Sequence, residues 1–148
     1  MIPLNDVRDF WNENPLCSRI IPYELGSRDY FNYYDRLRED IESKKESLRL
    51  HEYDKFNGKK ILDVGWGNGY VLENFAKHGG ITHGVDITPM SIELCQRRFE
   101  YAGILRGDFR VANAEDLPYP DNYFDCVTSM GVLHHVPDTE KAVKEIYR

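Results

Sequence analysis

Two stretches of the chain differ in their pattern of hydrophobic and polar positions. Residues 1–57 are rich in aromatic and charged residues and poor in β-branched ones. From residue 58 onward, short apolar runs alternate with segments whose apolar residues recur at helical spacing. This change predicts a helical lead-in or cap over residues 1–57, followed by an α/β domain over residues 58–148.

The lead-in is predicted to hold two helices. The first ends before Pro15, because a helix seldom continues into a proline. Ser27 is predicted to cap the second helix, in which apolar residues from Tyr30 to Ile41 form one stripe. We expect this second helix to extend to about residue 51.

The second stretch alternates between predicted strands and helices. The predicted strands are residues 60–64, 81–85, 109–111 and 124–129. Helices are predicted between them and after residue 138. Strands that alternate with helices of about ten residues indicate a parallel sheet with helices on both faces.

A glycine-rich turn follows the first predicted strand, with the sequence D-V-G-W-G-N-G at residues 63–69. Ligands of such sheets bind at the carboxyl ends of the strands. Glycines let the backbone approach a ligand closely, and the free N–H groups of the next helix favour an anion. In this strand–helix context the turn favours a nucleotide-like ligand over a plain tight connection.

Two more polar groups follow strands. Asp86 ends the second strand, where a carboxylate can accept hydrogen bonds from ribose hydroxyls; the alternative is a solvated side chain or a helix cap. Asn113 follows the third strand, and its amide oxygen, with the N–H of Ala114 or Glu115, can pair with an adenine edge. On spacing alone, a plain polar loop is the simpler interpretation of these three residues.

Composition narrows the classes of partner. The 148 residues include 19 Lys and Arg against 25 Asp and Glu, a net charge of −6, which counts against a nucleic-acid partner. No apolar run approaches the roughly 18 residues that span a bilayer, and no secretory signal is apparent, so we expect no membrane partner. Three cysteines without a C-x-x-C pair predict reduced thiols in a cytoplasmic protein, and no spacing predicts a metal site.

Four segments, in this order, resemble class I S-adenosylmethionine-dependent methyltransferases of the methyltransferase-11 type. They are I-L-D-V-G-W-G-N-G at 61–69, G-V-D at 84–86, N-A-E-D-L-P-Y-P-D-N-Y-F-D at 113–125, and S-M-G-V-L-H-H-V-P-D at 129–138. The resemblance covers about residues 58–148 and implies a Rossmann-like three-layer sandwich with strand order 3-2-1-4. It also implies S-adenosyl-L-methionine as cofactor, S-adenosyl-L-homocysteine as product, and a small-molecule methyl acceptor. The lead-in resembles a helical segment that folds over the cofactor pocket in some of these enzymes.

The resemblance implies roles for residues at one edge of the sheet. The expected cofactor contacts are Asp63, Gly65, Gly67 and Gly69 beside the methionine half, Asp86 at the ribose, Ile87 on the adenine, Asn113, Ala114 and Glu115 at the adenine end, and Met130 and Gly131 beside the methionine and the reactive methyl. His134 and His135 follow in the same loop, and either is a candidate general base, because an unperturbed imidazole titrates near pH 6.5. The alternative is that they only pack beneath the loop.

Two departures from the family pattern change the expectations. Trp66 stands where the family has a small residue or cysteine, and its indole is expected either to turn to solvent or to form a wall of the pocket. The family continues beyond the position of residue 148 into further strands, so we expect a truncated domain that lacks them. The fourth strand is then an exposed edge through which a second copy can pair as a homodimer.

Two other functions compete with methyl transfer. A nicotinamide-dependent oxidoreductase shares the strand, the glycine turn and Asp86, but Tyr70 occupies the last position of G-x-G-x-x-G, where a small residue is needed. A non-catalytic fragment that binds S-adenosylmethionine or S-adenosylhomocysteine retains the motifs without turnover. Binding of each cofactor, followed by a test of methyl transfer, distinguishes the three.

Overall fold

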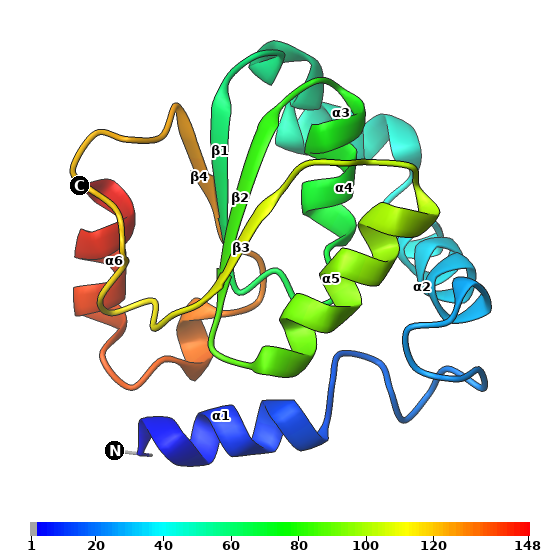
Figure 1. Ribbon diagram of the computed structural model, residues 1–148, viewed down its shortest axis with the longest axis horizontal. Coiled ribbons are helices and arrows are strands. Elements are labelled where there is room, and N and C mark those ends of the chain that lie inside the picture. Colours follow the sequence, from blue (N-terminus) through cyan, green and yellow to red (C-terminus); the bar gives the residue numbers. More distant parts are fainter. Residues whose placement is uncertain (1–2) are drawn as a thin grey trace.

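Four parallel strands form the centre of the molecule in the computed structural model, which describes residues 3–148 (Figure 1). They are β1 (Lys60–Val64), β2 (Ile81–Asp86), β3 (Asp108–Val111) and β4 (Cys126–Thr128). Their order across the sheet is β3-β2-β1-β4, and every neighbouring pair is parallel. The predicted 3-2-1-4 order is therefore confirmed. Residues 1–2 of the predicted lead-in lie outside the described residues.

Helices cover both faces of this sheet, as predicted. α4 (Tyr70–Lys77) and α5 (Pro89–Tyr101) pack on one face, and α6 (Thr139–Tyr147) lies on the other (Figure 1). Thr88 caps α5 through its hydroxyl, and Pro89 takes the first helical position, where its missing N–H costs nothing. Asp138 caps α6 through its carboxylate. The result is the three-layer α/β sandwich that the alternating pattern predicts.

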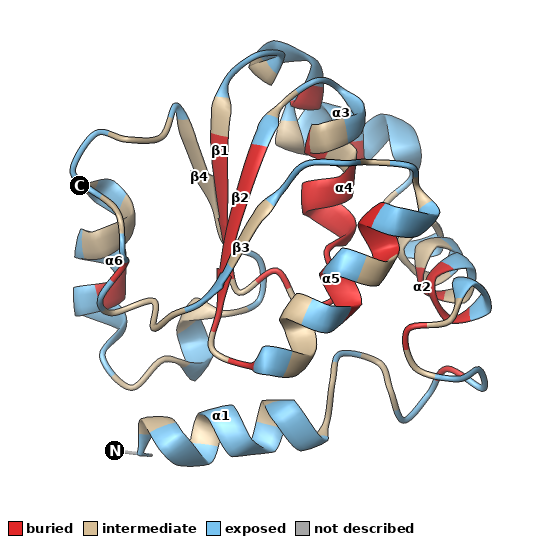
Figure 2. Cartoon of the chain, viewed as in Figure 1, coloured by how far each residue is buried: buried red, intermediate tan, exposed pale blue. Residues whose placement is uncertain are grey.

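The sheet is buried on both sides, which explains the nearly continuous apolar run of β1. Ile61, Leu62 and Val64 are each at most 1% exposed although successive side chains point to opposite faces. Figure 2 shows the buried residues gathered on β1, β2 and the facing sides of α4 and α5. Among the helices packed around this core, α1 (Leu4–Glu13) contributes no buried residue.

The long helix predicted after Ser27 is wrong beyond residue 41. Ser27 does cap α2 (Arg28–Ile41), but Ser43 then begins a separate helix, α3 (Lys44–His51). The Ser43 hydroxyl accepts from the Glu46 N–H, while the Glu46 carboxylate accepts from the Ser43 N–H. This reciprocal pair of hydrogen bonds satisfies backbone groups at the start of a helix. It therefore favours a new helix beginning at Lys44 over a continuation of α2.

The expected apolar stripe of α2 is shorter than predicted. Tyr30 and Tyr34 are buried, but Ile41 is 81% exposed because α2 ends there. A short 3-10 helix, η1 (Tyr53–Phe56), follows α3 and leads into β1. A second one, η2 (Leu133–His135), lies between β4 and α6. No helix within residues 3–148 has the length and hydropathy needed to cross a membrane.

Candidate functional site

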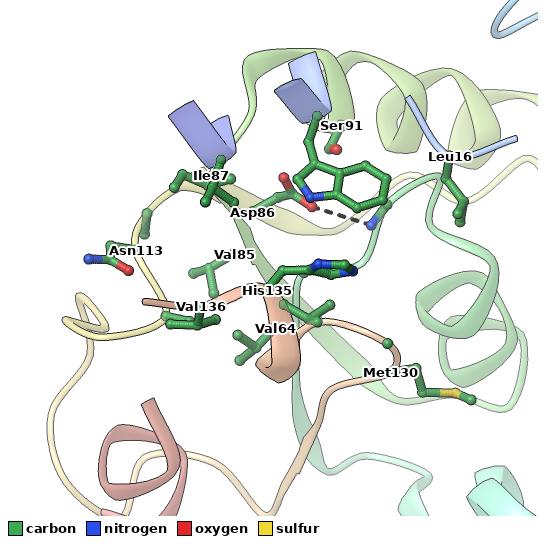
Figure 3. A pocket seen from close by; sticks show the side chains of 18 of the residues that line it. Leu16, Val64, Val85, Asp86, Ile87, Ser91, Asn113, Met130, His135 and Val136 are labelled. Atoms are coloured by element: carbon green, nitrogen blue, oxygen red, sulfur yellow. Dashed lines mark hydrogen bonds between the residues drawn. The ribbon is translucent and has the colours of Figure 1, made fainter. Parts of the chain in front are cut away.

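A cavity opens at the carboxyl ends of β1 and β2, beneath α1. The space between its walls, including the open mouth, is about 850 Å³. Its floor comes from the strand ends and the loops that follow them, and its roof comes from the N-terminal segment (Figure 3). This is the edge of the sheet at which the sequence predicts ligand binding.

Asp86 is the charged group of this cavity, and it is 8% exposed. One carboxylate oxygen accepts from the N–H and hydroxyl of Thr88 at 2.9 and 3.0 Å. The other accepts from the Gly67 N–H at 3.3 Å, which Figure 3 marks with a dashed line. Burial raises the pKa of Asp86, and these donors oppose the shift. A carboxylate has about four acceptor positions, so one is left for a ligand hydroxyl.

Gly65 shapes the cavity through the side chain that it lacks. Its φ is +74°, and a Cβ there would lie 2.4 Å from Val132 in the loop after β4. Only glycine combines that backbone angle with so close an approach. The loops after β1 and β4 therefore meet at this point and form a continuous wall.

Gly69 permits a close contact between two helices, and its predicted contact with the cofactor stays a prediction. Its φ is +82°, and a Cβ there would lie 2.6 Å from the sulfur of Cys95 in α5. Gly69 does not line the cavity. In the structure it lets α4 begin close against α5.

Trp66 follows neither of the two expectations for it. Its side chain is buried at 5% exposure, and the indole Nε1 donates to the carbonyl of Ser91 in α5 at 3.0 Å. A Cβ on Gly84 of β2 would lie 2.2 Å from the ring, so the bare backbone of Gly84 provides the space that the indole fills. The indole thus packs between the sheet and α5, and the cavity stays open.

The structure brings most of the predicted site residues together. Those that line the cavity are Gly65, Gly67, Asp86, Ile87, Asn113, Ala114, Met130, Gly131 and His135. Those that do not line it are Asp63, Gly69, Glu115 and His134. For these four, contact with a cofactor stays a prediction that the geometry leaves without direct support.

Asp63 lies behind the cavity floor, on the face of the sheet covered by α4 and α5. It is 3% exposed, and its Oδ1 has no hydrogen-bond partner. Burial, together with the nearby charge of Asp86, raises the pKa of Asp63 to about 8. At neutral pH the side chain is therefore mainly a neutral acid.

The loop after β3 is held by its own polar groups. The Asn113 side-chain oxygen accepts from the Glu115 N–H at 3.0 Å, which closes a local turn. The Glu115 carboxylate in turn accepts from the Asp138 N–H at the start of α6, also at 3.0 Å. Glu115 thus anchors the loop, while Asn113 lies at the edge of the cavity (Figure 3).

His135 is the titratable side chain of η2 that reaches the cavity (Figure 3). Its ring centroid lies 5.1 Å from that of Trp11 in α1 and 3.9 Å from that of His134. Burial and the neighbouring His134 lower the pKa of His135. His135 is therefore uncharged at neutral pH and able to accept a proton. Within residues 3–148, no group of three potential metal ligands occurs.

The residue-by-residue predictions missed most of the roof of the cavity. Leu4, Val7 and Trp11 lie on one face of α1 at helical spacing, and Pro15 and Leu16 continue this wall. The spacing of apolar residues in the first helix was the available signal. That spacing identifies a packing face, and only the resemblance of the lead-in indicated that this segment covers the pocket.

The residues present fit the S-adenosylmethionine that the sequence resemblance implies. Asp86 offers a free acceptor position at the strand end, and Gly65 and Gly67 leave the floor of the cavity bare of side chains. Ile87 and Ala114 provide an apolar slot beside Asp86 that suits a flat base. The cavity thus offers both the polar and the apolar groups that a bound nucleoside requires.

Comparison with known proteins identifies relatives for most of the α/β part. A family described as a methyltransferase domain matches residues 62–148. The chain is 36% identical over 95 residues to the ubiquinone/menaquinone biosynthesis C-methyltransferase UbiE of Vibrio cholerae, covering 62% of this chain and 36% of that protein. It is 39% identical over 101 residues to the ubiquinone biosynthesis O-methyltransferase of Chromobacterium violaceum, covering 66% of this chain and 43% of that protein.

The fold agrees with these sequence matches. The crystal structure of the YcgJ protein from Bacillus subtilis superimposes with a TM-score of 0.61 and 31% identity, over 68% of this chain and 44% of that one. The chain spans less than half of the length of these relatives. Since the family match covers more than half of the chain and the strand order agrees with the family fold, this protein belongs to the methyltransferase domain family.

Proposed function

We propose that the protein transfers a methyl group from S-adenosylmethionine to a small apolar acceptor. The observation that carries this proposal is the cavity at the ends of β1 and β2, in which Asp86 stands between the glycine turn and the apolar slot of Ile87. Membership of the methyltransferase domain family supports the same reaction.

The cofactor would lie along the floor of the cavity. Asp86 would accept a hydrogen bond from the ribose, Ile87 and Ala114 would pack on the adenine, and Met130 would lie beside the methionine half. When bound, S-adenosylmethionine supplies a methyl group made electrophilic by its sulfonium. The protein then mainly has to align the acceptor and exclude water, which proximity and a closed roof accomplish.

The roof residues would exclude that water. Leu4, Val7 and Trp11 present an apolar face over the cavity, and Leu16 extends it. For an acceptor that carries an acidic hydroxyl, His135 would take the proton, because its lowered pKa leaves it neutral at pH 7. A carbon or nitrogen acceptor without an acidic proton would need no such base.

The lining supports an apolar acceptor. Asp86 and His135 are the titratable side chains among the described lining residues, and apart from Ser91 and Asn113 the other lining side chains are aliphatic or aromatic. The names of two relatives place them in the biosynthesis of ubiquinone, a quinone. We therefore propose an uncharged, ring-bearing acceptor, with no nucleic-acid or membrane partner. A cytoplasmic location stays a prediction from the cysteine content.

Titration calorimetry with S-adenosylhomocysteine and with NADH tests the cofactor. We expect the protein to bind S-adenosylhomocysteine but not NADH, and Asp86→Ala to weaken binding by about tenfold or more, because a hydrogen bond to a charged group is lost. Asp40→Asn, which changes an exposed residue of α2, is the control and should bind normally. Binding of NADH alone would refute the proposal in favour of the oxidoreductase.

Transfer of isotope-labelled methyl to a panel of phenols and quinols tests the reaction itself. We expect a labelled product with at least one apolar ring compound and none with phosphorylated or cationic compounds. Binding of S-adenosylhomocysteine without transfer to any member of a broad panel would instead support the non-catalytic alternative. The two assays together separate the three functions that the sequence leaves open.

A further inference from the structure

Arg98 of α5 is a buried charge that connects three parts of the fold. It is 2% exposed. Its Nε donates to the backbone carbonyl of Asn68 in the glycine turn at 2.9 Å. Its Nη1 pairs with Glu73 of α4, and its Nη2 donates to Asp35 of α2 at 2.8 Å. One guanidinium therefore bridges the turn, the helix that follows it, and the N-terminal segment.

Because Arg98 is buried, its positive charge needs the two carboxylates as partners. Burial acts to lower its pKa, but the carboxylates of Asp35 and Glu73 outweigh it, and the pKa of Arg98 is raised. The guanidinium carbon also lies 4.6 Å from the ring centroid of Phe31. A buried charge that loses one partner is left uncompensated, so the group is expected to move or to admit water.

The turn that Arg98 holds is the one that faces Asp86. Asn68 is fully buried. The residue before it, Gly67, donates its N–H to Asp86, and the residue after it, Gly69, lies close against α5. The contact from Arg98 to the Asn68 carbonyl restrains the peptide that links Asn68 to Gly69. This contact restrains a segment whose glycines otherwise allow many backbone conformations.

A second contact links α2 to the same turn through Leu16. The Tyr30 hydroxyl of α2 donates to the Leu16 carbonyl at 2.5 Å. The side chain of Leu16 lies over Gly67, 3.2 Å from the point that a Cβ would occupy. The glycine turn is thus held from α2 by Asp35 through Arg98, and by Tyr30 through Leu16.

We propose that Asp35, which lies outside the cavity, is a positioning residue for the cofactor site, acting through Arg98 on the glycine turn. The proposal rests on the proposed function, because it assigns S-adenosylmethionine to the cavity beside that turn. It gives the N-terminal segment a role in cofactor affinity in addition to that of a roof.

Asp35→Asn tests the proposal because it removes the carboxylate charge and keeps the size of the side chain. Binding of S-adenosylhomocysteine is measured by calorimetry, at a temperature at which circular dichroism shows the variant fully folded. Amide hydrogen exchange of Gly67 and Gly69 is followed by NMR in the same samples without ligand. Asp40→Asn, on the exposed side of the same helix, is the matched control.

We expect Asp35→Asn to weaken binding by about tenfold and to accelerate exchange at both glycines, since a charged hydrogen bond is lost. Asp40→Asn should change neither, and Asp35→Glu, which keeps the carboxylate, should restore most of the affinity. A variant that melts earlier but retains wild-type affinity and exchange would show that Asp35 only stabilises the fold, which would overturn the proposal.

Two outcomes are kept apart by this design. Failure of the unaltered protein to bind S-adenosylhomocysteine would refute the proposed function, while the exchange measurement would still decide whether Asp35 restrains the turn. If Asp35→Asn does not fold, Arg98→Lys takes its place, because an ammonium can pair with Asp35 but lacks the fork that also reaches Asn68. Normal affinity and exchange in Arg98→Lys would equally overturn the proposal.

Discussion

At the scale of single residues, Asp63 carries a buried carboxyl group whose proton the fold retains. Its pKa rises from an ordinary value of 3.8 to about 8, first because burial disfavours the ion and then because Asp86 is nearby. The unfolded chain releases that proton near pH 4, whereas the folded chain keeps it. This contribution to stability is therefore complete below about pH 4 and is lost as the pH rises toward 8.

The prediction is that Asp63→Asn flattens the dependence of stability on pH. Relative to the variant, the unaltered protein should lose free energy of unfolding between pH 5 and pH 8, because the amide of the variant does not ionise. Urea denaturation at several pH values measures both. Parallel curves for the two proteins would show that Asp63 ionises normally in the folded state.

Trp66 and Gly84 form a pair in which one residue provides the space for the other. A Cβ at position 84 would lie 2.2 Å from the indole, so Gly84→Ala should destabilise the fold by about 1–3 kcal/mol or more through overpacking. Trp66→Cys removes the ring that the new methyl would meet. In the double variant the loss should be smaller than the sum of the two single losses, which chemical denaturation measures. Additive losses would contradict this pairing.

At the scale of elements, α1 is the helix whose stability we expect to depend most on whether the cavity beneath it is filled. It has no buried residue and no side-chain cap at its start, and its apolar face covers the cavity. Segments with few buried contacts open at low free energy, so amides of residues 4–13 should exchange quickly in the free protein.

Bound S-adenosylhomocysteine should slow that exchange, because the ligand fills the space under Val7 and Trp11. Hydrogen exchange read by mass spectrometry, with and without ligand, measures the effect. The strand segment 60–64, buried in both states, is the internal reference. Equal exchange of α1 in both conditions would show that this helix does not close over the ligand.

At the scale of the whole molecule, β4 pairs with β1 along one side only within residues 3–148. Unpaired strand edges are templates for further pairing, so the chain of residues 1–148 is predicted to form a homodimer through β4 at high concentration. X-ray scattering over a dilution series should show a dimer mass that falls to the monomer mass. A monomer at every concentration would contradict this prediction.

The sequence determines the parts of this protein that depend on local spacing. The alternation of apolar runs predicts the four strands, the glycines of residues 63–69 predict the turn, and a hydroxyl before a helix predicts its cap at Ser27. Asp86 was placed correctly at the cavity because a residue that ends a parallel strand must lie at the ligand edge. Ser43 and Glu46 have the spacing of a capping box, but the charged residues on both sides continue a helical pattern, which is why one long helix was expected there.

Only the tertiary structure decided which residues far apart in the chain meet. Trp66 is buried on Gly84, Leu16 covers Gly67, and Asp35 reaches Asn68 through Arg98. No periodicity specifies such contacts, since they depend on how whole helices and strands pack rather than on the conformational preference of a segment. For the same reason the residues at the strand ends could be predicted from their positions, while the residues of the roof could not, although the resemblance of the lead-in had indicated a helical segment there.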